Sequence, residues 1–165
     1  MAKILVVGVG NLLRLDDGFG VEVTRRLQSR ALPAGARVVE LGIAGLGLVQ
    51  ELLDGYDALI VVDAMRGGGP PGTTYLVEPK VADIAPTTGG RMGDCMADLH
   101  GAEPSKAMAM AKALGVLPRK VLVVGCEPGT VDELGIGLTE PVEQAAKQAV
   151  DRIAALLQEL EEGSR

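Results

Sequence analysis

The sequence contains three short runs made almost entirely of apolar residues, at positions 4–9, 58–62 and 121–125. β-branched residues predominate in these runs, and polar residues do not alternate with them. This pattern is typical of parallel strands that are covered by helices on both faces. Segments with the period of an amphipathic helix lie between the runs. We therefore predict an α/β fold, a three-layer α/β/α sandwich around a mostly parallel sheet.

The remaining elements complete a sheet of five strands. Further strands are expected at 38–41 and 73–78, and helices at 18–31, 46–53, 104–114 and 139–160. The strands at 58–62 and 73–78 are joined by only nine residues, 64–72. A parallel crossover needs ~10–12 residues including its helix. The strand at 73–78 is therefore predicted to run antiparallel to the others.

Length and composition restrict the class of protein further. With 165 residues, the chain is expected to form a single domain over residues 3–160, followed by a frayed polar tail at 161–165. The net charge of -6 and the three aromatic residues argue against nucleic-acid binding, which needs clustered cations or stacking platforms. Two cysteines make no disulfide framework, and no apolar run reaches the ~20 residues of a membrane span. We expect a soluble, cytoplasmic protein.

Several carboxylates follow the predicted strands, where ligands of such sheets bind. Asp16 and Asp17 come after the first strand, and one of the two is expected to cap the helix that follows. Asp63 ends the third strand and is predicted to point into the crevice. Glu127 follows the fifth strand, either as a turn residue or as a third crevice carboxylate. Its neighbour Cys126 is predicted to be a buried apolar residue and not a nucleophile.

His100 is the only histidine, and it lies in the long segment 80–102, which shows no regular period. A loop of this length is often functional. Together with Asp63 and one carboxylate of the Asp16–Asp17 pair, His100 makes a mixed oxygen and nitrogen set suited to a borderline divalent cation. Three protein ligands leave a coordination position for water or a substrate carbonyl, which is typical of hydrolytic metal sites.

A nucleotide- or phosphoryl-binding module is the alternative. Gly8 and Gly10 match the start of a dinucleotide-binding fingerprint, but Leu13 stands where the third glycine belongs. The two aspartates before the helix would also repel a pyrophosphate. A phosphoacceptor receiver domain requires a lysine at the end of the fifth strand, and none is present at 125–127.

Five motifs in order give the chain a more specific resemblance. They are GVGNLLRLDDGFG at 8–20, VVDA at 61–64, the single histidine in the long loop, GCEP at 125–128 and GLTEPVE at 137–143. In this order they resemble the [NiFe]-hydrogenase maturation endopeptidases, over residues 3 to about 157.

The resemblance implies an endopeptidase that removes a short C-terminal extension from the hydrogenase large-subunit precursor after nickel insertion. It also implies a five-stranded sheet with one antiparallel strand. The metal-contacting and catalytic residues of such enzymes would fall here on Asp17, Asp63 and His100. We expect the nickel to arrive with the substrate and not to be held tightly by the free enzyme, and we expect the enzyme to be a monomer.

Overall fold

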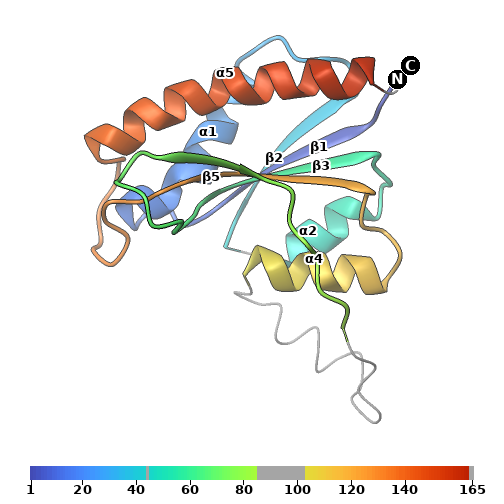
Figure 1. Cartoon of the computed structure of the whole chain (residues 1–165), viewed down its shortest axis with the longest axis horizontal. Helices are drawn as coiled ribbons and strands as arrows, with labels where there is room; N and C mark the ends of the chain where they lie inside the picture. Colours follow the sequence, from blue (N-terminus) through green and yellow to red (C-terminus); the bar gives the residue numbers. More distant parts are fainter. Residues whose placement is uncertain (44, 85–102, 164–165) are drawn as a thin grey trace.

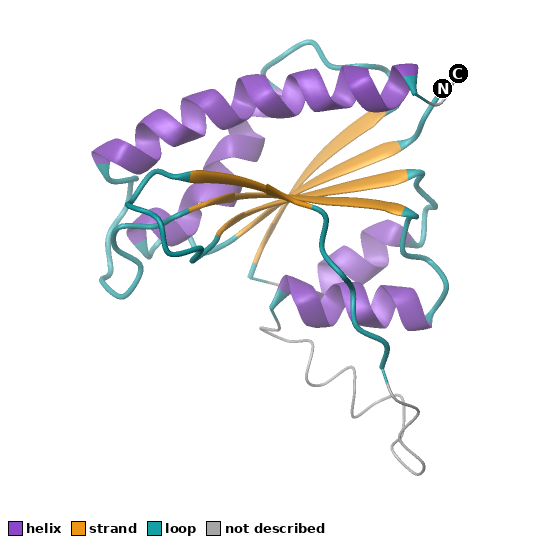
Figure 2. Ribbon diagram, viewed as in Figure 1, coloured by secondary structure: helices purple, strands orange, loops and turns teal. Residues whose placement is uncertain are grey.

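A five-stranded sheet forms the centre of the molecule, and helices cover both of its faces (Figures 1 and 2). The computed structural model describes residues 1–43, 45–84 and 103–163. The strands are β1 (Ile4–Val9), β2 (Ala36–Gly42), β3 (Ala58–Ala64), β4 (Thr74–Val77) and β5 (Lys120–Cys126). They lie in the order β2-β1-β3-β5-β4 across the sheet.

The helices form two outer layers, which confirms the predicted three-layer sandwich. One layer consists of α1 (Phe19–Gln28) and α5 (Glu140–Glu162), and the other of α2 (Gly45–Leu52) and α4 (Pro104–Ala113). A 3-10 turn, η1 (Leu15–Gly18), precedes α1.

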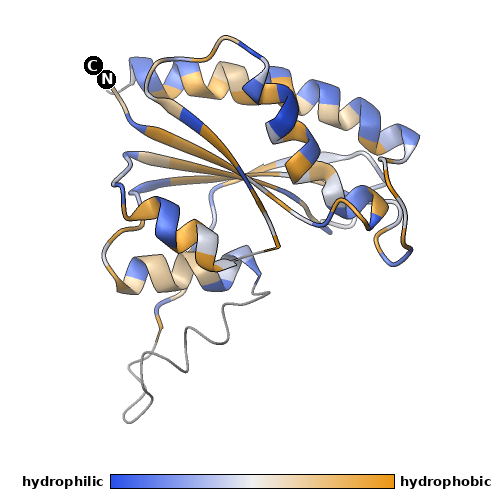
Figure 3. Ribbon diagram, turned by 180° about the vertical axis from the view of Figure 1, so that it is seen from behind, coloured by the Kyte–Doolittle hydropathy of each residue, from blue (hydrophilic) through white to orange (hydrophobic). Residues whose placement is uncertain are grey.

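The strands alternate their side chains between two apolar cores. In β1, Ile4 and Val6 pack in the core under α1 and α5, whereas Leu5 and Val7 pack in the core under α2 and α4. Successive residues of a strand point to opposite faces of a sheet. Because both faces are covered, both sets are apolar, and this explains the continuous apolar runs of the sequence. In Figure 3 the central strands are accordingly coloured mostly as hydrophobic.

The strand β4 runs antiparallel to the rest, as the short connection before it predicts. It pairs only with β5, in a register from Thr74 opposite Cys126 to Val77 opposite Val123. The other three pairings in the sheet are parallel. The carboxyl ends of β1, β3 and β5 therefore meet at one end of the sheet.

The longest helix, α5, continues further than expected. Its apolar stripe packs on the sheet through residues such as Val142, Ile153 and Leu157, as predicted. The helix runs to Glu162, and the amide of Gly163 donates to the carbonyl of Glu159 at 3.0 Å. The helix thus includes residues 161 and 162 of the expected polar tail, and the fraying of that tail stays a prediction. No helix of the described residues has the length and apolarity of a membrane span.

Candidate active site

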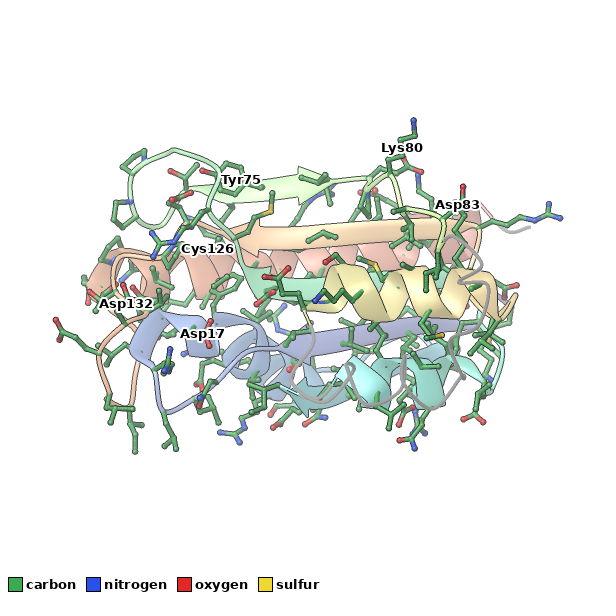
Figure 4. The ribbon with its side chains drawn as sticks, turned by 90° about the horizontal axis from the view of Figure 1, so that it is seen from below. Asp17, Tyr75, Lys80, Asp83, Cys126 and Asp132 are labelled. Carbon is green, nitrogen blue, oxygen red and sulfur yellow. The ribbon has the colours of Figure 1, made fainter. Side chains whose placement is uncertain are left out.

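The segment after β1 folds back on itself and places Asp17 at the carboxyl end of the sheet (Figure 4). Gly10 has a φ of +134°, and a Cβ atom there would lie 1.9 Å from the carbonyl oxygen of Asp17, so only glycine fits this turn. The amide of Asn11 donates to Oδ2 of Asp17 at 3.0 Å. The side chain of Asp17 is partly exposed, and its Oδ1 atom accepts no hydrogen bond from any described residue. This oxygen is available to a ligand.

The first glycine of the same motif serves packing. A Cβ atom at Gly8 would lie 2.2 Å from Oγ1 of Thr24 in α1. Gly8 therefore allows α1 to lie directly against β1, and Gly10 allows the turn at Asp17. Both glycines are explained by contacts within the protein, and the alternative of a phosphate-binding loop is not favoured.

Asp16 is buried, with no exposed side-chain surface, and it joins two distant loops. Its carboxylate accepts hydrogen bonds from the amide and the hydroxyl of Thr139, both at 2.7 Å. It also accepts from the amides of Gly129 at 2.8 Å and Thr130 at 3.1 Å. Neither η1 nor α1 has a side-chain cap, so the predicted helix-capping role of the pair is wrong. The carboxylate of Asp16 instead ties the loop after β1 to the loop before α5.

The same contacts set the ionisation of Asp16. Burial alone would raise its pKa, but hydrogen bonds from Thr139, Thr130 and Gly129 outweigh burial and lower the pKa below its usual value. Thr139 is the residue before α5, and its hydroxyl donates to Asp16 and caps no amide of the helix.

Asp63 is the next-to-last residue of β3, lies opposite Gly125 of β5, and is partly buried. Burial raises its pKa to about 7, and the negative charge of Asp17 contributes in the same direction. Glu103, directly before α4, raises it further, whereas the amide of Ala64 lowers it. The structure thus places Asp17 and Asp63 close enough for their charges to interact, as predicted.

Glu103 is a charged residue near Asp63 that the sequence analysis missed. Its position before Pro104, at the start of a helix that begins near the carboxyl edge of the sheet, was the available signal. The third predicted residue, His100, lies outside the described residues. Within the described ranges, no three His, Cys, Asp or Glu side chains lie close enough to hold a metal ion. The assignment of Asp17, Asp63 and His100 to a metal therefore stays a prediction.

Glu127 holds the glycine-rich loop at 66–72 in place. Its Oε2 atom accepts hydrogen bonds from the amides of Gly67 and Gly68 and from the hydroxyl of Tyr75 at 2.9 Å. That hydroxyl in turn accepts from the amide of Gly69 at 3.0 Å. The bond from Gly67 and the bond from Tyr75 lower the pKa of Glu127. Glu127 is therefore a loop anchor, and the hypothesis of a third crevice carboxylate is not supported.

Cys126 is fully buried in the core beside α5, as predicted. Burial raises the pKa of its thiol to about 11, which keeps it protonated and poorly nucleophilic. Met108 and Met110 also fill the core. Cys95 lies outside the described residues.

Comparison with known proteins decides the family. A family model described as hydrogenase maturation protease matches residues 21–156. The chain belongs to this family. The match begins after the motif at 8–20, so membership does not depend on Asp16 or Asp17.

Individual relatives agree with the assignment. The hydrogenase expression/formation protein HupM of Azotobacter chroococcum is 36% identical over 158 residues, 95% of this chain and 72% of the relative. Among solved structures, the hydrogenase maturating endopeptidase HybD of E. coli has a TM-score of 0.73 and 27% identity, covering 95% of this chain and 93% of that one. The hydrogenase 2 maturation peptidase of a Thaumarchaeota archaeon has a TM-score of 0.70 and 32% identity, covering 94% and 98%. This member of the family is a peptidase with the fold of these relatives.

We predict that Asp16→Ala lowers the free energy of unfolding by about 3 kcal/mol or more, because several buried donors lose a charged acceptor. Asp17→Ala, which removes one hydrogen bond, is the matched control and should cost about 1 kcal/mol. Urea denaturation followed by circular dichroism measures both. A cost of only ~1 kcal/mol for Asp16→Ala would match a simple helix cap and contradict this assignment.

We further predict that Asp63 makes stability fall as the pH rises from about 4 to about 7. The pKa is raised in the folded state, so the folded protein binds more protons than the unfolded chain in this window. The slope contributed by one group is at most about 1.4 kcal/mol per pH unit. The difference in unfolding free energy between wild type and Asp63→Asn isolates this contribution, since Asp16 affects both proteins. A difference that does not change with pH would refute the raised pKa.

Proposed function

We propose that this peptidase removes the C-terminal extension of a [NiFe]-hydrogenase large-subunit precursor once nickel has been inserted. The main support for the proposal is that Asp17 and Asp63 interact at the carboxyl ends of β1 and β3 in a member of this family. Of the relatives described above, one is a hydrogenase expression/formation protein and another is a hydrogenase maturating endopeptidase. In this proposal the nickel belongs to the substrate, and the enzyme recognises that it is present.

The electrostatics of the site support recognition of a cation. Besides burial, the negative charges of Asp17 and Glu103 raise the pKa of Asp63, because they repel a charge on its carboxylate. A divalent cation brought by the substrate would relieve this repulsion. Carboxylate oxygens and an imidazole suit a borderline cation such as nickel. We propose that Asp17, Asp63 and His100 contact the nickel of the precursor.

Hydrolysis of the scissile peptide bond needs a base that takes a proton from the attacking water and an acid that gives a proton to the leaving amine. Asp63 has a pKa of about 7 in the free protein, close to a working pH near neutral. A carboxyl group with such a pKa exchanges protons readily in both directions. We propose that this proton transfer passes through the carboxyl of Asp63.

We propose that the enzyme acts in the cytoplasm and that it is active as a monomer. Cys126 is a free thiol in the buried core, which fits a reducing compartment. The carboxyl ends of β1, β3 and β5 that form the site belong to one chain.

Cleavage of the nickel-loaded, unprocessed large subunit, followed by mass spectrometry, tests the proposal. We expect the wild type to release the C-terminal extension and to leave nickel-free precursor uncut. Asp63→Asn should fold but cleave more than about 100-fold more slowly. Asp83→Asn is the matched control, because Asp83 lies at the opposite end of the sheet and pairs with Lys112 (Figure 4). Full activity of Asp63→Asn would overturn the role of Asp63.

The free enzyme should carry no tightly bound metal. A permanent hydrolytic site usually has several His or Cys ligands and supporting hydrogen bonds, whereas this chain has one histidine. An enzyme that held its own ion would also lose the ability to distinguish loaded from empty precursor. Elemental analysis after dialysis measures the metal content. A near-stoichiometric zinc or nickel content would instead indicate a resident metal.

A further inference from the structure

An apolar groove lies beside the candidate site, between the segment after β1 and the loop before α5. Its cavity volume is ≈ 410 Å³. The apolar residues that line it are Leu12, Leu13, Leu15, Ile136 and Leu138. Glu22, Arg25 and Glu143 form its polar wall. None of these residues belongs to the predicted metal-contacting set.

The rim of the groove exposes large apolar side chains to solvent. The exposed fractions are 59% for Leu13, 84% for Leu134 and 84% for Ile136. Leu13 and Ile136 line the groove. Leu134 is not among the lining residues, but it precedes Gly135, whose amide donates to the carbonyl of Leu13. Contiguous exposed apolar surface of this kind marks interaction sites in soluble proteins.

The fold holds these side chains outward. The amide of Gly135 donates to the carbonyl of Leu13 at 2.9 Å, and the amide of Leu15 donates to the carbonyl of Gly135 at 3.1 Å. Leu15 has a φ of 49°, a left-handed conformation that is uncommon for a branched residue. Asp16, the next residue, ties this segment to Thr139. The exposed apolar surface is therefore built by the same network that supports the site.

Charges around the groove favour a basic partner. Arg26 bridges Glu22 at 3.3 Å and Glu143 at 2.9 Å, so two carboxylates share one cation. Asp132 and Glu133 are exposed beside Leu134, and neither makes an ion pair or hydrogen bond with a described residue. Only Arg14 lies near them as an unpaired cation, on the facing segment. Arg25 in the groove wall is paired with Glu40, and Lys147 lies near Glu143. Asp132 and Glu133 therefore remain as exposed carboxylates without an ion pair to a described residue, and they favour a cationic side chain on the partner.

The groove lies close to the candidate site. Asp17 follows Leu15 by two residues in the same turn, and Figure 4 shows Asp17 and Asp132 at the same end of the sheet. A protein seated on the groove would be held while its chain end reaches the carboxylates. Two copies of this chain joined symmetrically at this surface would bring Asp132 and Glu133 toward their own counterparts, which like-charge repulsion disfavours.

We infer that this groove is the docking surface for the folded body of the substrate, through a segment that presents an apolar side chain flanked by Lys or Arg. The inference rests on the proposed function and adds a second point of recognition to the nickel. Binding energy from this surface holds the precursor while its extension enters the site. The groove should therefore affect KM and leave kcat unchanged.

The test compares wild type with three variants in steady-state cleavage of nickel-loaded precursor. Leu134→Ser combined with Ile136→Ser should raise KM at least about tenfold with kcat unchanged, since both side chains are exposed and the fold does not depend on them. Leu76→Ser is the matched control, because Leu76 is 47% exposed on β4, away from the groove, and its KM should equal that of wild type. Asp132→Lys combined with Glu133→Lys should slow association and weaken its salt dependence.

The outcomes separate the two proposals. Suppose that wild type cleaves the precursor and that the double variant, Leu134→Ser with Ile136→Ser, has an unchanged KM. The docking inference is then refuted, and the proposed function is unaffected. A reduced kcat at constant KM would also overturn it. If wild type fails to cleave, the proposed function and the inference fall together. Sedimentation that shows a wild-type dimer abolished by the double substitution would assign the groove to a copy of this chain and overturn the inference.

Discussion

The carboxylate of Asp16 connects two parts of the chain that are 123 residues apart at their most distant contact. It receives donors from Gly129, Thr130 and Thr139, and it lies fully out of solvent. An ionised carboxylate is costly to bury unless its oxygens are satisfied by donors. The loop after β1 and the loop before α5 must therefore be formed together. The position of Asp17 and the exposed groove both depend on this one contact.

The carboxylates of the carboxyl-end loops divide into two groups by their hydrogen bonds. Asp16 and Glu127 accept several bonds each, and their pKa values are lowered. Asp63 lacks such a set of donors and faces Asp17, so burial and like charge raise its pKa to about 7. The first group organises loops, and the second is left with unsatisfied charge that a cation or a proton can satisfy.

The two loop anchors also act on different sides of the site. Asp16 holds the segment that carries Asp17, and Glu127 holds the glycine-rich loop at 66–72 through Gly67 and Tyr75. The glycine-rich loop belongs to no helix or strand, and the segment of Asp17 forms only the four-residue 3-10 turn η1, so regular backbone hydrogen bonding contributes little to the position of either. Buried side chains perform that task instead.

The layers, the antiparallel strand and the placement of Asp17 and Asp63 at one edge of the sheet could all be predicted from the amino-acid sequence. These features follow from local periodicity, from a connection of nine residues and from the rule that parallel strands end together. The roles of Asp16 and Glu127, in contrast, could be recognised only in the folded protein. Adjacent aspartates in one turn look alike locally, and their donors come from residues more than a hundred positions away for Asp16 and about sixty for Glu127. Burial and long-range hydrogen bonding, which no local pattern encodes, separate the structural carboxylate from the one left open to a ligand.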